Sequence, residues 1–150
     1  MCAADCSHAA KEYLESLRLE RRTLEQEHEM LRRLEADSRA ITAAISPDRV
    51  GGTGNLRSGE DRLIRMADAA AALQERKRAY DLRRAEALRV IMRLEDARHR
   101  LVLGNRYLLG MDWADVAGCI GYEERQMFRV HGAALTAFGE KMSADVSRCQ

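Results

Sequence analysis

Proline most constrains what this chain can fold into, because its 150 residues contain only one, Pro47. Proline lacks an amide donor and restricts the residue before it, so Ser46-Pro47 ends any helix that reaches it. Elsewhere apolar residues recur at spacings of three and four, which indicates helices rather than strands. Charged residues make up 33% of the chain and aromatic residues 5%, a composition typical of long helices. The sequence therefore predicts an all-α fold.

The chain divides into segments around this proline. Residues 1–45 form an N-terminal amphipathic segment, with one long helix predicted over 9–45. Residues 46–59 are expected to be a flexible connector, because they contain four glycines as well as Asn55 and Ser58. Ser58 and Asp61 supply a capping oxygen and an acidic first turn, so a second long helix is predicted over 60–95.

The first long helix carries a narrow apolar seam on a charged rod, the pattern of a coiled-coil partner. Its members fall at a seven-residue spacing or on a companion stripe: Leu17, Leu24, Leu31 and Ile45, with Leu34 and Ile41 beside them. Two such helices fold back as an antiparallel hairpin or pair between chains. The pattern does not choose between these two arrangements, and a homodimer through the long helices is the expected assembly.

Several classes of protein are disfavoured by what the sequence lacks. No apolar run approaches a membrane span, and the first residues lack the basic start and apolar stretch of a signal peptide, so we expect a cytoplasmic protein. Cys2, Cys6 and His8 have no second Cys/His pair, which predicts free thiols and no metal site. Cys119 lies in an apolar pattern and is expected to be a buried small side chain. No nucleophile has a base at a meaningful spacing, so neither an enzyme nor a cofactor is expected.

Charge gives no support for nucleic-acid binding by itself. The net charge is +1, and the basic and acidic residues of 96–150 cancel. A protein that neutralises few phosphates binds DNA weakly without sequence preference. Any affinity for DNA must therefore depend on where individual charges lie.

The sequence pattern changes after the long helices. Three short helices are predicted over 96–109, 112–120 and 123–138, followed by a tail over 139–150. Asp96 and Asp112 are placed as helix caps, and Gly110 and Gly121 as left-handed helix ends. A helix-turn-helix needs a small residue at the helix crossing, a turn residue that tolerates positive φ, and apolar residues at fixed offsets. Those positions are filled by Ala117, Gly121, Val116, Ile120, Met127, Val130 and Ala134.

The stretch from Leu109-Gly-Met-Asp-Trp to Ala-Ala-Leu135 resembles region 4 of bacterial sigma factors. It is most similar to small phage- and prophage-borne regulators of this sigma-like group (RinA/ArpU-like regulators), with Leu94-Glu95-Asp96 and Arg106-Tyr107-Leu108 ahead of the motif. The resemblance covers roughly residues 50–138 and implies a tri-helical DNA-binding module. Two departures stand out: Glu123 replaces the usual Ser or Thr cap, and Glu124 adds a second acid near the phosphates.

The resemblance places the last short helix in the major groove of DNA, with its outward residues as candidate contacts. Arginines suit guanine edges and a glutamate suits cytosine, whereas Phe128 is expected to pack against a neighbour more than to touch thymine. Trp113 is expected to anchor the domain core. Arg98, Arg100 and Arg106 on the preceding helix are candidates for phosphate contact or for solvated positions. The candidate DNA-binding residues are Glu124, Arg125, Gln126, Phe128, Arg129 and His131, with a packed His131 an equal alternative.

The expected function is sequence-specific binding of double-stranded DNA to control transcription of phage or mobile-element genes. Family resemblance adds RNA polymerase as a partner. Two alternatives stay open. One is a phage DNA-packaging recognition subunit of the small-terminase type, which also joins a helix-turn-helix to helical arms. The other is a coiled-coil interaction protein whose helix-turn-helix only packs, which the near-zero charge favours.

Overall fold

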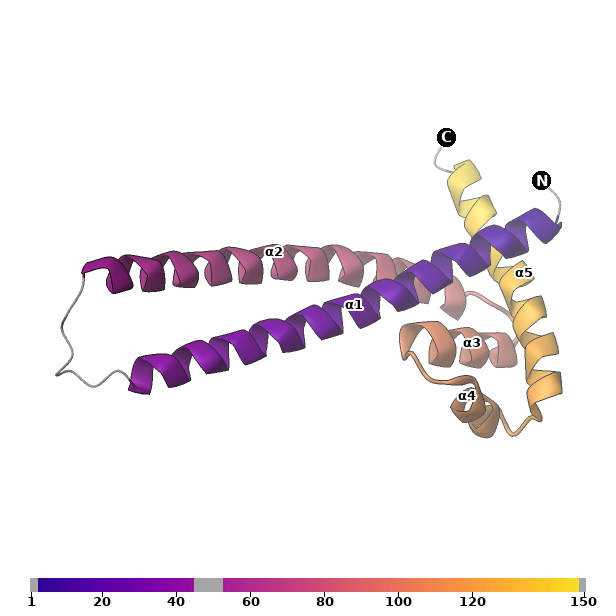
Figure 1. Cartoon of the computed structure of the whole chain (residues 1–150). Helices are drawn as coiled ribbons and strands as arrows, with labels where there is room; N and C mark the ends of the chain where they lie inside the picture. The colour runs from indigo at the N-terminus through magenta and orange to yellow at the C-terminus, as the bar shows by residue number, and fades with distance from the viewer. Residues whose placement is uncertain (1–2, 45–52, 149–150) are drawn as a thin grey trace. The chain divides into compact units, whose positions relative to one another are not determined.

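The computed structural model describes residues 3–44 and 53–148, and these residues contain helices and no strand (Figure 1). The all-α prediction is therefore confirmed. The elements are α1 (Ala3–Ala44), α2 (Thr53–Met92), α3 (Ala97–Leu103), the π-helical turn η1 (Gly104–Leu108), α4 (Trp113–Ile120) and α5 (Glu124–Arg148). None of the described helices is long and apolar enough to cross a membrane.

The helix boundaries differ from the sequence prediction at three places. α1 begins at Ala3 rather than at residue 9. α2 begins at Thr53, so part of the expected connector is helical, while residues 45–52 lie outside the described residues. α5 continues to Arg148, so the expected tail over 139–150 is largely helix. In each case the neighbouring helix extends over residues with no proline, because an established helix propagates more easily than it starts.

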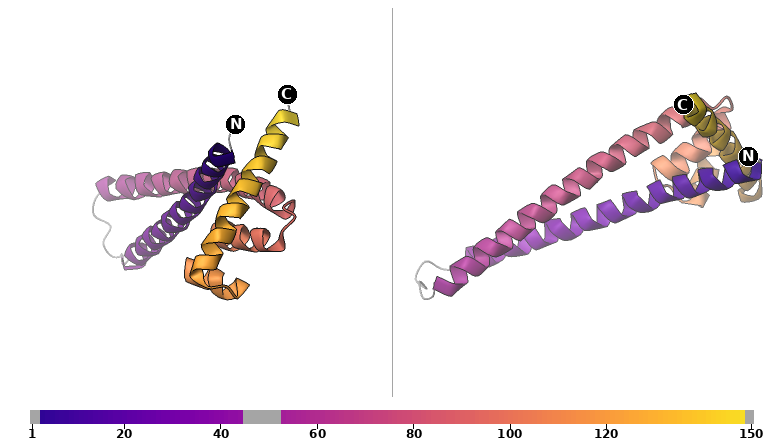
Figure 2. Two further views of the ribbon diagram at one scale, coloured as in Figure 1. Left: turned by 90° about the vertical axis from the view of Figure 1, so that its right-hand side faces the viewer. Right: turned by 90° about the horizontal axis from the view of Figure 1, so that it is seen from above.

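The chain separates into two compact units. We call Met1–Glu20 with Tyr80–Gln150 the core unit, and Arg21–Ala79 the helix-pair unit. Figure 2 shows the ribbon of α1 to α5 in two further views. In the core unit the buried apolar side chains come from all of its helices. They include Leu14, Leu17, Ile91, Leu94, Val102, Leu103, Tyr107, Val116, Met127, Ala134 and Phe138.

The start of α1 is part of the core unit rather than a separate arm. Tyr13 stacks on Phe138 of α5 with ring centroids 6.3 Å apart, and its hydroxyl donates to the Arg83 carbonyl oxygen at 3.3 Å. Gly139 approaches α1 so closely that a Cβ at this position would clash with the Cys6 carbonyl oxygen. Glycine at 139 therefore permits the crossing of α1 and α5.

In the helix-pair unit α1 and α2 run in opposite directions within one chain (Figure 1). They are joined by an ion pair of 2.6 Å between Glu27 and Arg76. Leu24 of the expected seam is buried and Leu31 is half-buried. The companion stripe is not part of this contact, because Leu34 and Ile41 are more than half exposed. Ile45 lies outside the described residues.

Candidate nucleic-acid interface

The site predicted from the sequence is built by α4, a tight turn and α5. The turn forms at Gly121, whose φ of 72° and ψ of 30° lie in the left-handed region, where glycine avoids the steric cost of a side chain. The amides of Gly121 and Tyr122 both donate to the Ala117 carbonyl oxygen, at 3.0 and 3.1 Å. Gly110 also has a positive φ, of 74°. Both left-handed glycines predicted from the sequence are thus confirmed.

The two helices share a small apolar cluster. Val116 and Ala117 of α4 and Met127 of α5 are buried in it, and Met111, Trp113, Ile120 and Tyr122 pack around them. Further along α5 the buried side chains fall at residues 131, 134, 135 and 138, whereas Val130 is only half-buried. The predicted apolar face of α5 is therefore correct at Met127 and Ala134, but His131 occupies the central position that was assigned to Val130.

Trp113 holds three side chains together at the start of α4. The guanidinium carbon of Arg106 lies 4.3 Å from its ring centroid, and the rings of His131 and Phe128 lie 4.7 and 5.2 Å away. A guanidinium over an indole face is favourable by about 0.5–2 kcal/mol. The tryptophan thus packs between η1 and α5, as an anchor of the core should. Phe128 combines this contact with 45% exposure, so it packs on one side and faces solvent on the other.

His131 is a core residue rather than a surface contact. Its side chain is buried, and its Nε2 lies 2.9 Å from the Tyr107 hydroxyl. Burial, helped by the charges of Lys11 and Arg106, lowers the pKa of His131 from 6.5 to about 4. Burial likewise raises the pKa of Tyr107, so the phenol stays protonated. Because the imidazole is enclosed, we leave His131 out of the candidate interface.

Two arginines, the buried Arg106 and the half-buried Arg18, connect α1 to the start of α4. Arg106 donates from Nη1 to the Met111 carbonyl oxygen at 3.0 Å, and its Nη1 lies 3.8 Å from Asp112. Arg18 of α1 lies 3.6 Å from the same carboxylate. Burial and the charge of Arg18 lower the pKa of Arg106. Asp112 occupies the N-cap position of α4 but makes no side-chain cap bond, because its carboxylate lies against these two guanidinium groups.

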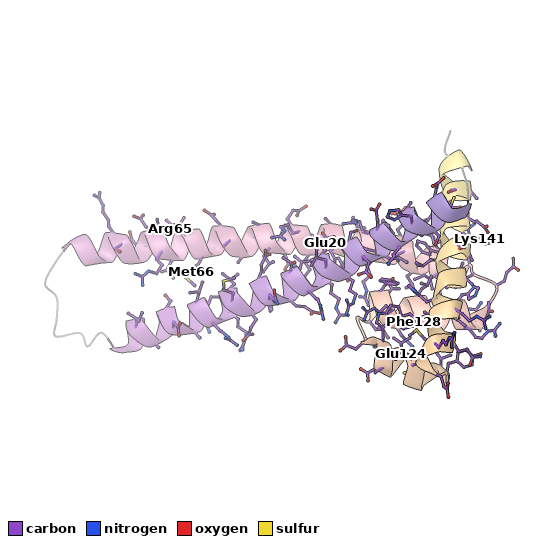
Figure 3. All side chains as sticks on the ribbon, turned by 45° about the vertical axis from the view of Figure 1, so that its right-hand side comes forward. Glu20, Arg65, Met66, Glu124, Phe128 and Lys141 are labelled. Atoms are coloured by element: carbon purple, nitrogen blue, oxygen red, sulfur yellow. The ribbon has the colours of Figure 1, made fainter. Side chains whose placement is uncertain are left out.

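The remaining candidates gather on the N-terminal part of α5. Glu124, Arg125, Gln126 and Arg129 are all exposed, together with the outer side of Phe128. Figure 3 shows Glu124 and Phe128 near the start of this helix. Residues 125, 129 and 132 recur at helical spacing on the side opposite to Met127 and His131, and Phe128 lies between this side and the packed one. This exposed set includes two arginines and one partly exposed aromatic ring.

The three arginines ahead of α4 are engaged elsewhere. Arg98 pairs with the α3 cap Asp96 at 2.7 Å, and the Asp96 side chain also accepts from the Arg98 amide at 2.8 Å. Arg100 donates to the carbonyl oxygens of Leu94 and Glu95. Arg106 is enclosed as described above. The prediction that Arg106 is a phosphate contact or a solvated side chain is therefore wrong, because the π-turn η1 directs it inward.

Acidic side chains outnumber basic ones at the N-terminal ends of α4 and α5. Asp112, Asp115, Glu123 and Glu124 are all exposed there, against Arg125 and Arg129. Cys119 is also exposed on α4, which contradicts its predicted burial. Asp115 lies in the first turn of α4 and Glu124 in the first turn of α5, where carboxylates stabilise the helix dipole. These acids thus favour the fold of the helices while they oppose the approach of phosphate.

Sequence reasoning missed Arg18 and the role of Tyr107. The triplet Arg106-Tyr107-Leu108 was noted in the sequence, but nothing in the spacing shows that all three are buried consecutively.

Among the described residues no cluster of His, Cys, Asp and Glu could hold a metal ion, and Cys2 and Cys149 lie outside them. Comparison of the chain with protein families, curated proteins and solved structures found no match.

Proposed function

We propose that this chain is a sequence-specific DNA-binding regulator of transcription in which α4, the Gly121 turn and α5 act as a helix-turn-helix. In this proposal α5 is the recognition helix and enters the major groove with Arg125, Phe128 and Arg129. The observation that carries it is the two-sided character of α5. One face is fixed by Met127, His131 and Ala134, and the opposite face presents two arginines to solvent.

Rigid support makes this face suitable for reading bases. A recognition side chain discriminates between bases only if its backbone is held in place, since a bidentate contact depends on geometry. α5 is held by the Trp113 contacts near its start and by the Tyr13 and Gly139 contacts further along. The sigma-like resemblance extends the proposal to phage or mobile-element promoters and to RNA polymerase as a partner.

The test is a selection of binding sites from random duplex DNA, followed by affinity measurements on the selected site. Loss of a bidentate arginine–guanine contact costs about 1–3 kcal/mol, or about fivefold to 150-fold in affinity. We expect this loss in Arg125→Ala or Arg129→Ala, together with a relaxed preference at one base pair. Arg89→Ala is the matched control, because Arg89 is an exposed arginine on α2. Equal binding by all three variants and the wild type would refute the proposal.

A second function is favoured by the acidic surface. The exposed carboxylates of Asp115, Glu123 and Glu124 outnumber the two exposed arginines, and this balance suits a basic protein partner better than a polyanion. In that case α4 and α5 only pack together, and the chain is an interaction protein. Glu124→Gln separates the two functions, because removing a carboxylate near phosphates should strengthen DNA binding. If no sequence is selected and Glu124→Gln leaves DNA retention unchanged, the interaction protein is favoured. Genome-wide DNA immunoprecipitation distinguishes a regulator from a DNA-packaging subunit. Enrichment at promoters would support the regulator, and enrichment at a packaging site would support the packaging subunit.

A further inference from the structure

Phe128 is an aromatic side chain that is held on one side and open on the other. Its ring packs on Trp113 with the ring centroids 5.2 Å apart, and the residue is 45% exposed. Trp113 in turn contacts Arg106 and His131, which are both buried. The core therefore fixes the position of the Phe128 ring, while its outer edge faces solvent.

Gly132, one helical turn after Phe128, leaves the outer side of the ring uncovered. The side chains of an α-helix lean toward its N-terminus, so a side chain at position 132 would lean over Phe128. Gly132 is exposed, and a Cβ at this position would lie in open space among the described residues. The packing of the core unit thus does not require glycine here, in contrast to Gly139. What the glycine provides is open space beside the ring.

The charged side chains next to Phe128 indicate which kind of group suits this space. Arg125 lies one turn before it and Arg129 directly follows it, and neither arginine has an ion pair within the described part of the chain. Glu124 also lies one turn before Phe128 and is exposed. A phosphate placed against the ring would lose hydration without gaining a hydrogen bond from it, and it would face this carboxylate. An uncharged apolar group avoids both costs.

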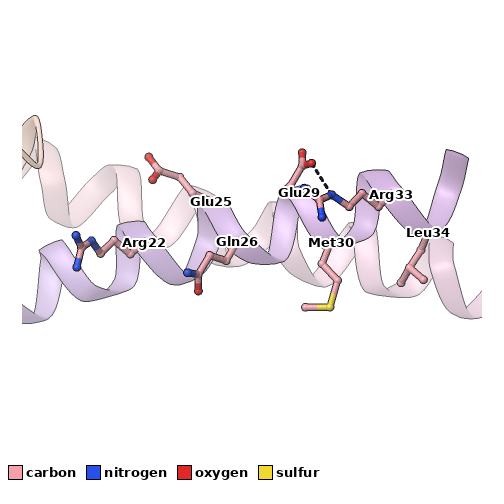
Figure 4. Close-up of a pocket in the computed structure, with 7 residues that line it drawn as sticks. All are labelled: Arg22, Glu25, Gln26, Glu29, Met30, Arg33 and Leu34. Atoms are coloured by element: carbon pink, nitrogen blue, oxygen red, sulfur yellow. Dashed lines mark hydrogen bonds and ion pairs between the residues drawn. The ribbon is translucent and has the colours of Figure 1, made fainter.

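Met30 and Leu34 on α1 are also exposed apolar side chains, but their charged neighbour is already paired. Both are more than half exposed, and Figure 4 shows them near Arg33, which pairs with Glu29 at 2.8 Å. The arginines next to Phe128 are instead open to a ligand. One molecule can therefore make an apolar contact with the ring and polar contacts with the guanidinium groups beside it.

We propose that Phe128 reads the 5-methyl group of a thymine in the major groove, near the guanines that Arg125 and Arg129 contact. This inference rests on the proposed function, because it takes α5 as the recognition helix. The thymine methyl is the apolar group that base pairs present in the major groove, and it distinguishes T·A from the other pairs. Phe128 then determines specificity at one base pair, and Gly132 gives the methyl group access to the ring. The contact with Trp113 holds the ring in place for this purpose.

The first experiment compares thymine with uracil at each position of the duplex that the full chain selects from random DNA. Deoxyuridine pairs as thymidine does and lacks only the 5-methyl group. We expect binding to weaken about fourfold at one thymine, the effect of exposing one buried carbon. Phe128→Ala should bind the thymine and uracil duplexes equally. Leu82→Ala is the matched control, because Leu82 is a 74% exposed leucine on α2, and it should keep the wild-type ratio.

The second experiment fills the open space beside Phe128. Gly132→Ala should reduce the ratio of thymine to uracil affinity from about fourfold toward one, although alanine favours the helix. Gly59→Ala is the matched control, because Gly59 is an exposed glycine of α2 that also has open space around it. The ratio separates base reading from folding, since a loss of folded protein weakens binding to both duplexes alike.

The outcomes distinguish this inference from the proposed function. If a site is selected and depends on Arg125 or Arg129, but uracil is tolerated at every thymine, the methyl reading is wrong and the regulator stands. A wild-type ratio in Phe128→Ala leads to the same conclusion. A wild-type ratio in Gly132→Ala overturns the placement of the methyl group beside position 132. If no duplex is selected, both the inference and the proposed function are overturned.

Discussion

Acid should weaken the core unit through His131 in particular. Its pKa is lowered from 6.5 to about 4 by burial against Tyr107 and Trp113. The neutral imidazole can accept from the Tyr107 hydroxyl at Nε2 or donate to it, whereas the protonated imidazole can only donate and carries a charge in a buried site. In the unfolded chain the same imidazole takes up its proton near pH 6.5.

The sign of the effect follows from which state binds the proton first. Above pH 6.5 the imidazole is neutral in both states, so it adds no pH dependence. As the pH falls from 6.5 to about 4, only the unfolded state is protonated, and the free energy of unfolding decreases by about 1.4 kcal/mol per pH unit. Over this interval the loss is about 3 kcal/mol. Below it both states carry the proton and the decrease stops.

Trp113 provides the assay, because it is the only tryptophan of the chain and its ring lies 4.7 Å from the His131 ring. Urea unfolding followed by tryptophan fluorescence between pH 7 and pH 4 gives the free energy of unfolding. His131→Gln keeps a neutral polar group opposite Tyr107 but does not titrate. The carboxylates titrate alike in both proteins, so their contribution cancels in the comparison. Parallel pH dependence in the wild type and in His131→Gln would refute the reasoning.

Four further substitutions test the packing around the site, each by urea unfolding at pH 7. Gly121→Ala should cost about 1–2 kcal/mol, because alanine at a φ of 72° is strained; an unchanged stability would mean that the turn is not left-handed. Gly139→Ala should cost about 1–3 kcal/mol through the clash with the Cys6 carbonyl, whereas Gly132→Ala, with open space around it, should stabilise α5 by up to about 1 kcal/mol. Similar effects at both glycines would contradict the close crossing. Arg106→Leu should cost about 1–3 kcal/mol, as it removes the bond to Met111 and the contact with Trp113. A gain in stability would show that the buried Nε without a partner outweighs both contacts.

Local rules were enough to predict the helix ends near the site. Asp96 caps α3 and Gly121 ends α4 as expected, because capping and left-handed turns depend on one or two residues. The exposed face of α5 was also predictable from helical phase. Leu34 and Ile41, by contrast, were assigned to a seam by spacing alone, and spacing does not say which of two neighbouring stripes meets the partner helix.

The environment of Arg106 and His131 was not predictable, because it depends on residues far apart in the chain. η1 adds a residue to one helical turn and so changes which side chains face inward after Gly104. Arg106 then reaches Trp113, and Tyr107 reaches His131 of α5. A regular helix over 96–109 has no means of burying residues 106, 107 and 108 in succession, since three consecutive side chains span most of its circumference.

The same long-range contacts decide which part of the chain the candidate interface requires. The sequence pattern predicts that residues 1–45 and residues 96–138 are separate parts of the fold, a long helix and a short three-helix module. Leu14 and Leu17 are nevertheless fully buried in the core unit, and Arg18 lies against the α4 cap. The proposed recognition helix is therefore held in place by residues more than a hundred positions earlier in the chain. Binding to DNA must accordingly be measured on the whole chain, in which the start of α1 is present.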